Sequence, residues 1–168
     1  VPVLLSGEKE GYKREGYDLG NSPLEFTPEK VSGKTIVHLT TNGTRALVAA
    51  SSAREILLVS FANLSAAAKY LRNMGGEAER ILGVVSGREG EYCLEDTVCL
   101  GGLLTRLLVP PGWDYSITDA GRTAIDLFQV YRERLPEMIR QCYHGRYLEK
   151  IGLGKECRFC VDLVVAVH

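Results

Sequence analysis

The segment Thr40–Ala46, with the sequence TTNGTRA, carries residue types that bind anions at the start of a helix. Asn42 is a favourable N-cap residue, and Gly43 allows a tight backbone turn. Arg45 falls in the first helical turn, where the positive end of the helix dipole disfavours a cation. An anion held by the helix amides and by Arg45 would resolve this conflict. The predicted phosphate or carboxylate site consists of four consecutive residues: Asn42, Gly43, Thr44 and Arg45.

Two adjacent carboxylates, Glu95 and Asp96, begin the segment 94–108, whose leucines recur at helical spacing. Asp96 lies four residues before Leu100 and therefore continues the apolar stripe of the helix inward. A carboxylate in the first turn is also favoured by the helix dipole, so helix capping is the alternative role. Near the preceding loop at Ser86, the inward carboxylate would offer oxygen ligands to a hard cation such as Mg²⁺. A cap and a metal site both stay open as roles.

Cys99 and His144 are two further candidates for a chemical role. Cys99 lies one turn after the carboxylates, near a helix N-terminus that would lower the pKa of its thiol and make it a nucleophile. The commoner role of a free cysteine is that of a small buried hydrophobic residue. His144 stands beside Gly145 at a predicted helix break, where a polar site and a helix C-cap are the two alternatives.

Three apolar segments, at 35–39, 55–59 and 80–85, are each followed by a helical pattern. Three consecutive strand–helix units predict parallel strands joined by right-handed crossovers. Ligands of such sheets bind beyond the carboxyl ends of the strands. The polar residues at these ends are Thr40, Thr41, Asn42, Ser60, Asn63, Ser86 and Arg88. Any one of them alone would be an ordinary cap or turn residue, but three polar ends in register favour a ligand site.

Further strands are expected at Val3–Leu5 and 161–167, and further helices at 64–74 and from Asp119 onward. The long segment between the first two strands is rich in glycine and charge and is expected to be mostly irregular. These elements predict an α/β fold with three layers, α/β/α, and a largely parallel or mixed sheet. The 168 residues, of which 45% are hydrophobic, suffice for a single domain with its own core.

The charge and the cysteine content of the chain limit which kinds of binding partner and which cellular compartment are expected. The net charge is −1 and no run of like charges occurs, so neither nucleic acid nor an anionic membrane is expected as the main partner. Five cysteines are an odd number, which favours free thiols in a reducing cytoplasm over a disulfide framework. Cys157 and Cys160 have C-x-x-C spacing, but no second pair completes a zinc site.

Six sequence blocks occur in an order that resembles the 2-phosphosulfolactate phosphatase family. The blocks are Gly20–Pro23 (GNSP), Thr40–Ala46 (TTNGTRA), Ser60–Asn63 (SFAN), Leu94–Cys99 (LEDTVC), Thr118–Ala120 (TDA) and His144–Gly145. The family also carries an N-terminal strand–loop motif of the type D-x-L-R-A, which this sequence lacks. We therefore expect residues 1–168 to be a single α/β domain that forms the C-terminal major part of a longer phosphatase chain, with an open side that favours homo-oligomers.

The resemblance implies Mg²⁺-dependent hydrolysis of a small 2-hydroxy-acid phosphate monoester. By resemblance this substrate is 2-phosphosulfolactate, whose product sulfolactate lies on the route to coenzyme M. The residues expected to bind the phosphate or shape its rim are Asn42, Gly43, Thr44, Arg45, Asn21, Asn63, Ser86, Arg88 and His144. The expected catalytic residues are Asp96, Glu95 and Cys99, and the expected metal ligands are Glu95, Asp96 and Asp119. The alternative function is a non-catalytic module that binds an anion without turnover.

Overall fold

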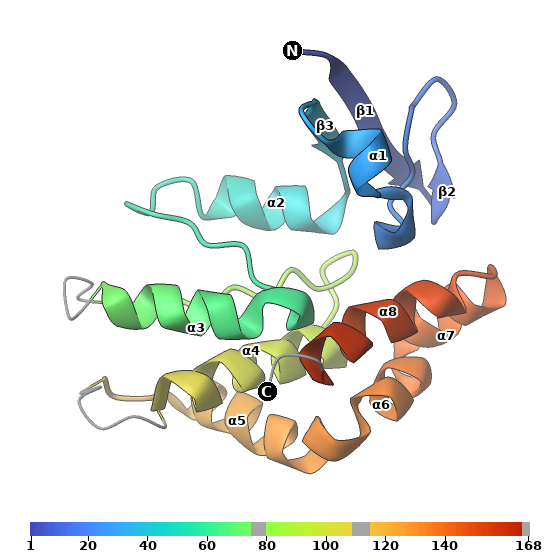
Figure 1. Cartoon of the computed structure of the whole chain (residues 1–168). Helices are drawn as coiled ribbons and strands as arrows, with labels where there is room; N and C mark the ends of the chain where they lie inside the picture. Colours follow the sequence, from blue (N-terminus) through green and yellow to red (C-terminus); the bar gives the residue numbers. More distant parts are fainter. Residues whose placement is uncertain (75–79, 109–114, 166–168) are drawn as a thin grey trace.

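The computed structural model describes residues 1–74, 80–108 and 115–165 and shows an α/β fold (Figure 1). Its α-helices in these residues are α1 (Pro28–Val31), α2 (Asn42–Ala49), α3 (Leu64–Asn73), α4 (Leu94–Leu108), α5 (Asp119–Tyr131), α6 (Leu135–Gln141), α7 (Tyr143–Lys150) and α8 (Gly154–Val165). Short 3-10 helices are η1 (Pro23–Glu25), η2 (Phe61–Asn63) and η3 (Arg132–Arg134). The helices that the sequence predicts at 64–74, at 94–108 and from Asp119 are α3, α4 and α5. None of the described helices is both long and apolar enough to cross a membrane.

The sheet lies at the top of Figure 1, and α3 to α8 form a helical body below it. In the described residues the sheet has three strands in the order β2-β1-β3. β1 (Val3–Lys9) pairs in parallel with β3 (Thr35–Leu39) and antiparallel with β2 (Tyr12–Lys13). The two strands predicted in this region are therefore confirmed, and the sheet is mixed.

The main hydrophobic core lies among the helices. Its members come from η2, α3, α4, α5, α6 and α8. The most completely buried large side chains in the described residues include Leu64, Leu107, Met138, Val98 and Val161. Burying one such side chain stabilises a fold by about 1.5–3 kcal/mol, so this helical body carries most of the apolar stabilisation.

The helices α4 and α5 are antiparallel and approach so closely that Gly101 has no room for a side chain. A Cβ at Gly101 would lie 1.9 Å from the carbonyl oxygen of Ala124. One turn further along α4, the side chain of Leu104 lies 3.5 Å from the Cβ position of Gly121, which belongs to the first turn of α5. The start of α5 thus lies beside the C-terminal half of α4.

Three predicted strands are wrong. Residues 55–59 and 80–85 form no strand, and the segment predicted as a strand at 161–167 continues α8 to Val165; its last two residues lie outside the described residues. A strand requires a neighbour whose N–H and C=O groups pair with its own, and sequence periodicity says nothing about that neighbour. A short apolar run also fits a buried helix face, as Cys157 and Val161 show: they lie four residues apart in α8 and are both buried. The sheet is consequently smaller than predicted.

We expect Gly101→Ala to lower the free energy of unfolding by about 3 kcal/mol, because the new methyl group would overlap a backbone oxygen that cannot move alone. Gly43→Ala is the matched control, since the nearest heavy atom to its Cβ position lies 3.5 Å away. Alanine is a better helix former than glycine, so this control is expected to change stability by less than about 1 kcal/mol. Urea unfolding of both variants measures the difference, and equal stabilities would contradict the close packing of α4 on α5.

Candidate active site

A tight turn at Arg88–Glu91, just before α4, is the first part of the candidate site. The N–H of Arg88 donates to the carbonyl of Glu91 at 3.1 Å, and the N–H of Glu91 donates to the carbonyl of Arg88 at 2.8 Å. The two residues between them, Glu89 and Gly90, have φ values of 54° and 89°. Positive φ at both positions is typical of the two-residue turn that reverses the chain most tightly. The turn therefore fixes the backbone from which the Arg88 side chain projects.

Asp96, in the first turn of α4, holds the loop that leads into this turn. Its Oδ2 accepts a hydrogen bond from the N–H of Gly87 at 2.8 Å and another from the hydroxyl of Ser86 at 3.4 Å. Burial raises the pKa of the Asp96 carboxyl; the bond from Gly87 partly opposes this effect, and the charge of Glu95 adds to it. The carboxylate is thus partly desolvated and sits in a fixed position.

The guanidinium of Arg88 lies over two tyrosine rings of α7. Its central carbon is 4.5 Å from the ring centroid of Tyr147 and 5.4 Å from that of Tyr143. One amino nitrogen of Arg88 is buried and has no hydrogen-bond partner among the described residues. Buried polar groups are nearly always hydrogen-bonded, so this nitrogen marks a place where an acceptor oxygen fits.

His144 belongs to the same cluster. Its ring stacks on that of Tyr147, with centroids 6.2 Å apart and planes inclined by 16°. Its Nδ1 is also buried without a partner in the part of the chain that the structure describes. Burial lowers the pKa of His144; the charge of Glu95 opposes this shift and that of Arg88 adds to it. The imidazole is therefore largely neutral at pH 7 and able to accept a proton.

Glu95 faces the cluster from the start of α4. Burial raises the pKa of the Cys93 thiol to about 11 and that of Cys142 to about 12, and a hydrogen bond with Glu95 adds to each shift. Cys142 also precedes α7 as its N-cap residue, and its sulfur accepts a hydrogen bond from the N–H of Gly145 at 3.3 Å. Glu95 and the first turn of α7 are thereby in contact with the same thiol.

The structure brings together residues that the sequence assigned to one site from separate elements. They come from the loop before α4, the first turn of α4 and the first turn of α7. The residues are Ser86, Arg88, Glu95, Asp96 and His144. We refer to these five residues as the polar cluster. Their catalytic and binding roles remain predictions.

The start of α2 adjoins the polar cluster through Asn42. The Oδ1 of Asn42 accepts a hydrogen bond from the N–H of Glu89 at 3.1 Å, in the middle of the tight turn. The N-cap residue of α2 is Thr41, so the predicted N-cap role of Asn42 is wrong. Asn42 instead connects the TTNGTRA segment to the turn that carries Arg88.

The other residues of the predicted anion site lie at the same helix start. The hydroxyl of Thr44 donates to the carbonyl of Thr40 at 2.6 Å, and Gly43 follows Asn42 in the first turn. Arg45 is exposed, and among the described residues no carboxylate or carbonyl binds its guanidinium. This arginine is therefore available to an external anion, and the anion itself remains a prediction.

Three of the predicted binding and metal residues belong neither to the polar cluster nor to the start of α2. Asn63 is used locally: it accepts from the N–H of Ser60 at 2.7 Å and donates to the carbonyl of Leu58 at 2.9 Å, which is the ordinary capping alternative. Asn21 is exposed and has no contact with the cluster among the described interactions. Asp119 begins α5 beside the C-terminal half of α4, about 12 Å along the helix from the first turn. The described arrangement thus does not make Asp119 a third ligand beside the two carboxylates.

The predicted low pKa of Cys99 is wrong. Burial raises the pKa of its thiol to about 12, and the charge of Asp96 adds to the shift. The side chain packs against the hydrophobic core, which is the alternative role that the sequence left open. A thiol that stays protonated at neutral pH is a poor nucleophile, so no catalytic role is assigned to Cys99. All five cysteines are free thiols in the structure.

The acidic pair fits a metal ion that is shared with a substrate. Among the described residues, no three His, Cys, Asp or Glu side chains gather closely enough to hold a metal on their own. Mg²⁺ commonly binds one or two carboxylates and completes its octahedron with waters and phosphate oxygens. Glu95 and Asp96, consecutive in the first turn of α4, would supply the protein part of such a site, and the metal itself stays a prediction.

Tyr143 and Tyr147 are functional candidates that the sequence reasoning missed. They flank His144 at a spacing of four residues, which places both rings on one face of α7. The hydroxyl of Tyr147 also donates to the carbonyl of Glu10 at 3.0 Å, so the ring is anchored between the β1–β2 turn and Arg88. The spacing of the two tyrosines is visible in the sequence. Its functional significance depends on Arg88, and only the structure places Arg88 over the rings.

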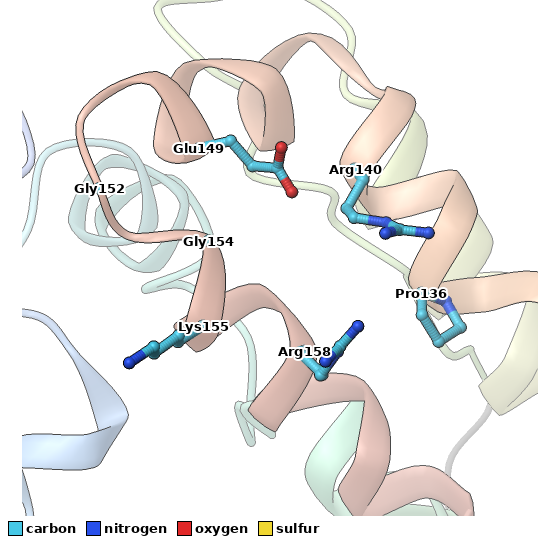
Figure 2. A pocket seen from close by; sticks show the side chains of 7 residues that line it. All are labelled: Pro136, Arg140, Glu149, Gly152, Gly154, Lys155 and Arg158. Atoms are coloured by element: carbon cyan, nitrogen blue, oxygen red, sulfur yellow. The ribbon is translucent and has the colours of Figure 1, made fainter.

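A surface pocket of about 410 Å³ lies apart from the polar cluster, between α6, α7 and α8 (Figure 2). Its lining residues are Pro136, Arg140, Glu149, Gly152, Gly154, Lys155 and Arg158. None of them belongs to the predicted site. Glu149 follows His144 by five residues, about 140° around α7, so the pocket and the cluster use different faces of this helix.

The α/β fold places Arg88, a half-buried arginine with one buried unpaired nitrogen, in one cluster with two carboxylates and a histidine. The chain belongs to the 2-phosphosulpholactate phosphatase family, whose family model matches residues 2–166. It is 37% identical over 160 residues to a probable 2-phosphosulfolactate phosphatase of Caldanaerobacter subterraneus. This match covers 95% of this chain and 64% of the relative. Probable 2-phosphosulfolactate phosphatases of Thermotoga petrophila and Synechocystis are each 39% identical, with 94% and 96% of this chain and 65% and 67% of the relatives covered. The chain thus spans about two thirds of the length of these relatives.

We expect the pKa of His144 in the folded protein to lie below its ordinary value of 6.5. Below about pH 6.5 the unfolded chain then binds more protons than the folded one, so the free energy of unfolding falls as the pH is lowered through this range. NMR titration of the imidazole and urea unfolding at about pH 7.5 and 5.5 test this expectation. His144→Gln should remove this part of the pH dependence, whereas a His144 pKa above 6.5 would contradict the burial of the ring.

Proposed function

We propose that the protein hydrolyses a small 2-hydroxy-acid phosphate monoester, namely 2-phosphosulfolactate, to sulfolactate and phosphate. The observation that carries the proposal is the buried, unpaired amino nitrogen of Arg88 in one cluster with Asp96 and His144. A phosphate ester supplies the acceptor that this nitrogen lacks, His144 supplies a group for proton transfer, and Asp96 supplies a carboxylate for a metal ion. Membership in the family supports the same activity.

Two arginines at adjoining positions suit two of the three anionic groups of such a substrate, which are the phosphate, the sulfonate and the carboxylate. Arg88 is held over the ring of Tyr147, so its planar fork is pre-organised for phosphate oxygens. Arg45 and the amides at the start of α2 would bind the sulfonate or carboxylate group. The hydrogen bond between Asn42 and Glu89 connects these two anion-binding elements and keeps them at a fixed separation.

His144 is the best-placed proton acceptor of the polar cluster. In the proposed step a water attacks the phosphorus, the bond from phosphorus to the ester oxygen breaks, and the leaving oxygen takes up a proton from the solvent. His144 is neutral at pH 7 and has a ring nitrogen without a partner, so it can take the proton that the attacking water loses. Phosphoryl transfer depends mainly on positioning and charge neutralisation, which the fixed arginine provides.

The acidic pair is proposed to hold Mg²⁺. The ion, when bound by Glu95 and Asp96, would supply positive charge to the phosphoryl oxygens. The raised pKa of Asp96 supports this assignment, because the carboxylate is desolvated and has a negative neighbour. A cation at this position would compensate for both effects.

A non-catalytic anion-binding module is the second candidate function. The observation that favours it is the use of Asp96 Oδ2 in two bonds to the loop, which gives this carboxylate a purely structural role. Such a module would bind phosphate through Arg88 and leave 2-phosphosulfolactate uncleaved. The two functions are separated by the variants below.

Asp96→Asn is expected to reduce phosphate release from 2-phosphosulfolactate at least about 100-fold. The free energy of unfolding should stay the same or rise, because the amide oxygen still accepts from Gly87 and the desolvated charge is gone. Asp119→Asn is the matched control and should keep full activity, since Asp119 lies beside the far half of α4. Phosphate release and urea unfolding are measured on all three proteins, and an active Asp96→Asn protein would refute the catalytic assignment.

Arg88→Gln is expected to weaken the binding of inorganic phosphate at least about tenfold, which corresponds to about 1.4 kcal/mol. The exposed Arg80→Gln has the same change of charge away from the tyrosines and should bind as the parent does. Calorimetric titration with phosphate measures both. Removal of Mg²⁺ with a chelator should abolish turnover in the parent, and turnover that persists without Mg²⁺ would contradict the proposed metal site.

A further inference from the structure

Three extended segments expose an unusual amount of apolar surface. They are β3, residues 55–59 before α3, and residues 81–85 before α4. Their exposed large apolar residues are Val37, Leu39, Ile56, Leu57, Leu58, Leu82, Val84 and Val85. The exposed fractions of Leu58 and Leu82 are 65% and 78%. We call these eight residues the apolar band; extended apolar surface of this kind marks interaction sites in soluble proteins.

Two of these segments, 55–59 and 81–85, have unpaired backbones, and β3 is unpaired along one edge. Among the described residues, no N–H of 55–59 or 81–85 donates to another backbone carbonyl. β3 pairs with β1 along one edge, and no described strand lies on its other edge. Unpaired extended backbone with β-branched and leucine side chains is a template for additional strands.

The two unpaired segments lie on one helical layer. The segment 55–59 is held on α3: the Tyr70 hydroxyl donates to the carboxylate of Glu55, and the carbonyl of Leu58 accepts from Asn63. Residues 81–85 lie on α4, where Gly83 approaches the side chain of Leu100 so closely that a Cβ would be 2.6 Å from it. The helices α3 and α4 pack against each other, so the two segments share one helical layer. The sides of both segments that face away from these helices are exposed. Strands that are apolar on both sides are typical of the interior of a parallel sheet.

We propose that the apolar band is the docking surface for a further polypeptide that supplies apolar β-strands. The five residues of β3 carry no Lys, Arg, Asp or Glu, and in the two segments Glu55 is the one such side chain, so a highly charged partner does not fit. An uncharged strand fits, because it pairs the free backbone and buries the side chains together. The match covers 64% of the Caldanaerobacter subterraneus relative, so about a third of that relative lies outside it. This remaining third is the occupant that the proposal names.

The test uses that third of the Caldanaerobacter subterraneus relative as a separate polypeptide, mixed with this chain. Size-exclusion chromatography with light scattering is expected to show a one-to-one complex. Far-UV circular dichroism of the mixture should show more β structure than the sum of the two parts. The fluorescence of the apolar dye ANS on this chain should fall when the polypeptide is added, because the apolar band becomes covered.

Charged substitutions locate the surface. Leu58→Asp and Leu82→Asp are each expected to weaken the complex at least about tenfold. Val130→Asp on α5 is the matched control, because Val130 is 56% exposed but lies outside the band, and it should leave the affinity unchanged. All three positions are solvent-exposed, and the helical circular dichroism of each variant alone confirms that it folds.

Two results would overturn the proposal. In the first, no complex forms, and neither Leu58→Asp nor Leu82→Asp reduces the binding of ANS to this chain. The band would then not be an apolar docking surface. The other is a dimer of this chain that is broken by both substitutions and not displaced by the polypeptide, since a second copy would then be the occupant. Self-association that the polypeptide does displace would support the proposal.

Discussion

The hydrogen bond from the N–H of Gly87 to the carboxylate of Asp96 is the contact on which the candidate site depends. It fixes the loop before α4 to the first turn of that helix, and the loop continues into the turn at Arg88–Glu91. From this turn Arg88 reaches the tyrosines of α7, and the backbone of Glu89 reaches Asn42 at the start of α2. Three helices that are distant in sequence are therefore positioned around one short loop. A buried charged acceptor makes such a bond strong, which suits a contact with this positioning role.

The charges of the polar cluster shift one another in directions that suit proton transfer. Burial raises the pKa of Asp96 and lowers that of His144, so both groups move away from their charged forms. The tyrosine rings beside Arg88 partly replace the hydration of its guanidinium. The cluster thus combines a guanidinium with two groups whose pKa values are both shifted in favour of the neutral form. Such a combination is expected where an anion is bound and a proton is moved.

Local patterns predicted the parts of the fold that depend on local interactions. The leucine stripe of α4, the helix that begins at Asp119 and the apolar runs that become β1 and β3 follow from local periodicity and capping chemistry. The inward direction of Asp96 followed from its place on the same stripe. Asn63 and Cys99 show the limit of this reasoning, since each has a capping or packing role that the sequence could not separate from a functional one. The partnership of Arg88 with Tyr147 was beyond prediction, because it joins residues from two elements whose packing only the structure gives.

The missing strands have a different cause from these local ambiguities. Residues 55–59 and 81–85 have the composition of buried strands, and each packs one side on a helix as a strand of an α/β sheet would. Within the described residues, they lack a partner for the backbone and a cover for the outer side. Strand pairing joins residues that are distant in sequence. A local sequence can therefore favour an extended strand without determining which segment pairs with it. The polar ends of these same segments, at Ser60 and Ser86, lie where they leave the apolar band, and Ser86 reaches the polar cluster through Asp96. Covering the band would therefore also restrain the loop that positions Arg88, which couples completion of the sheet to the geometry of the candidate site.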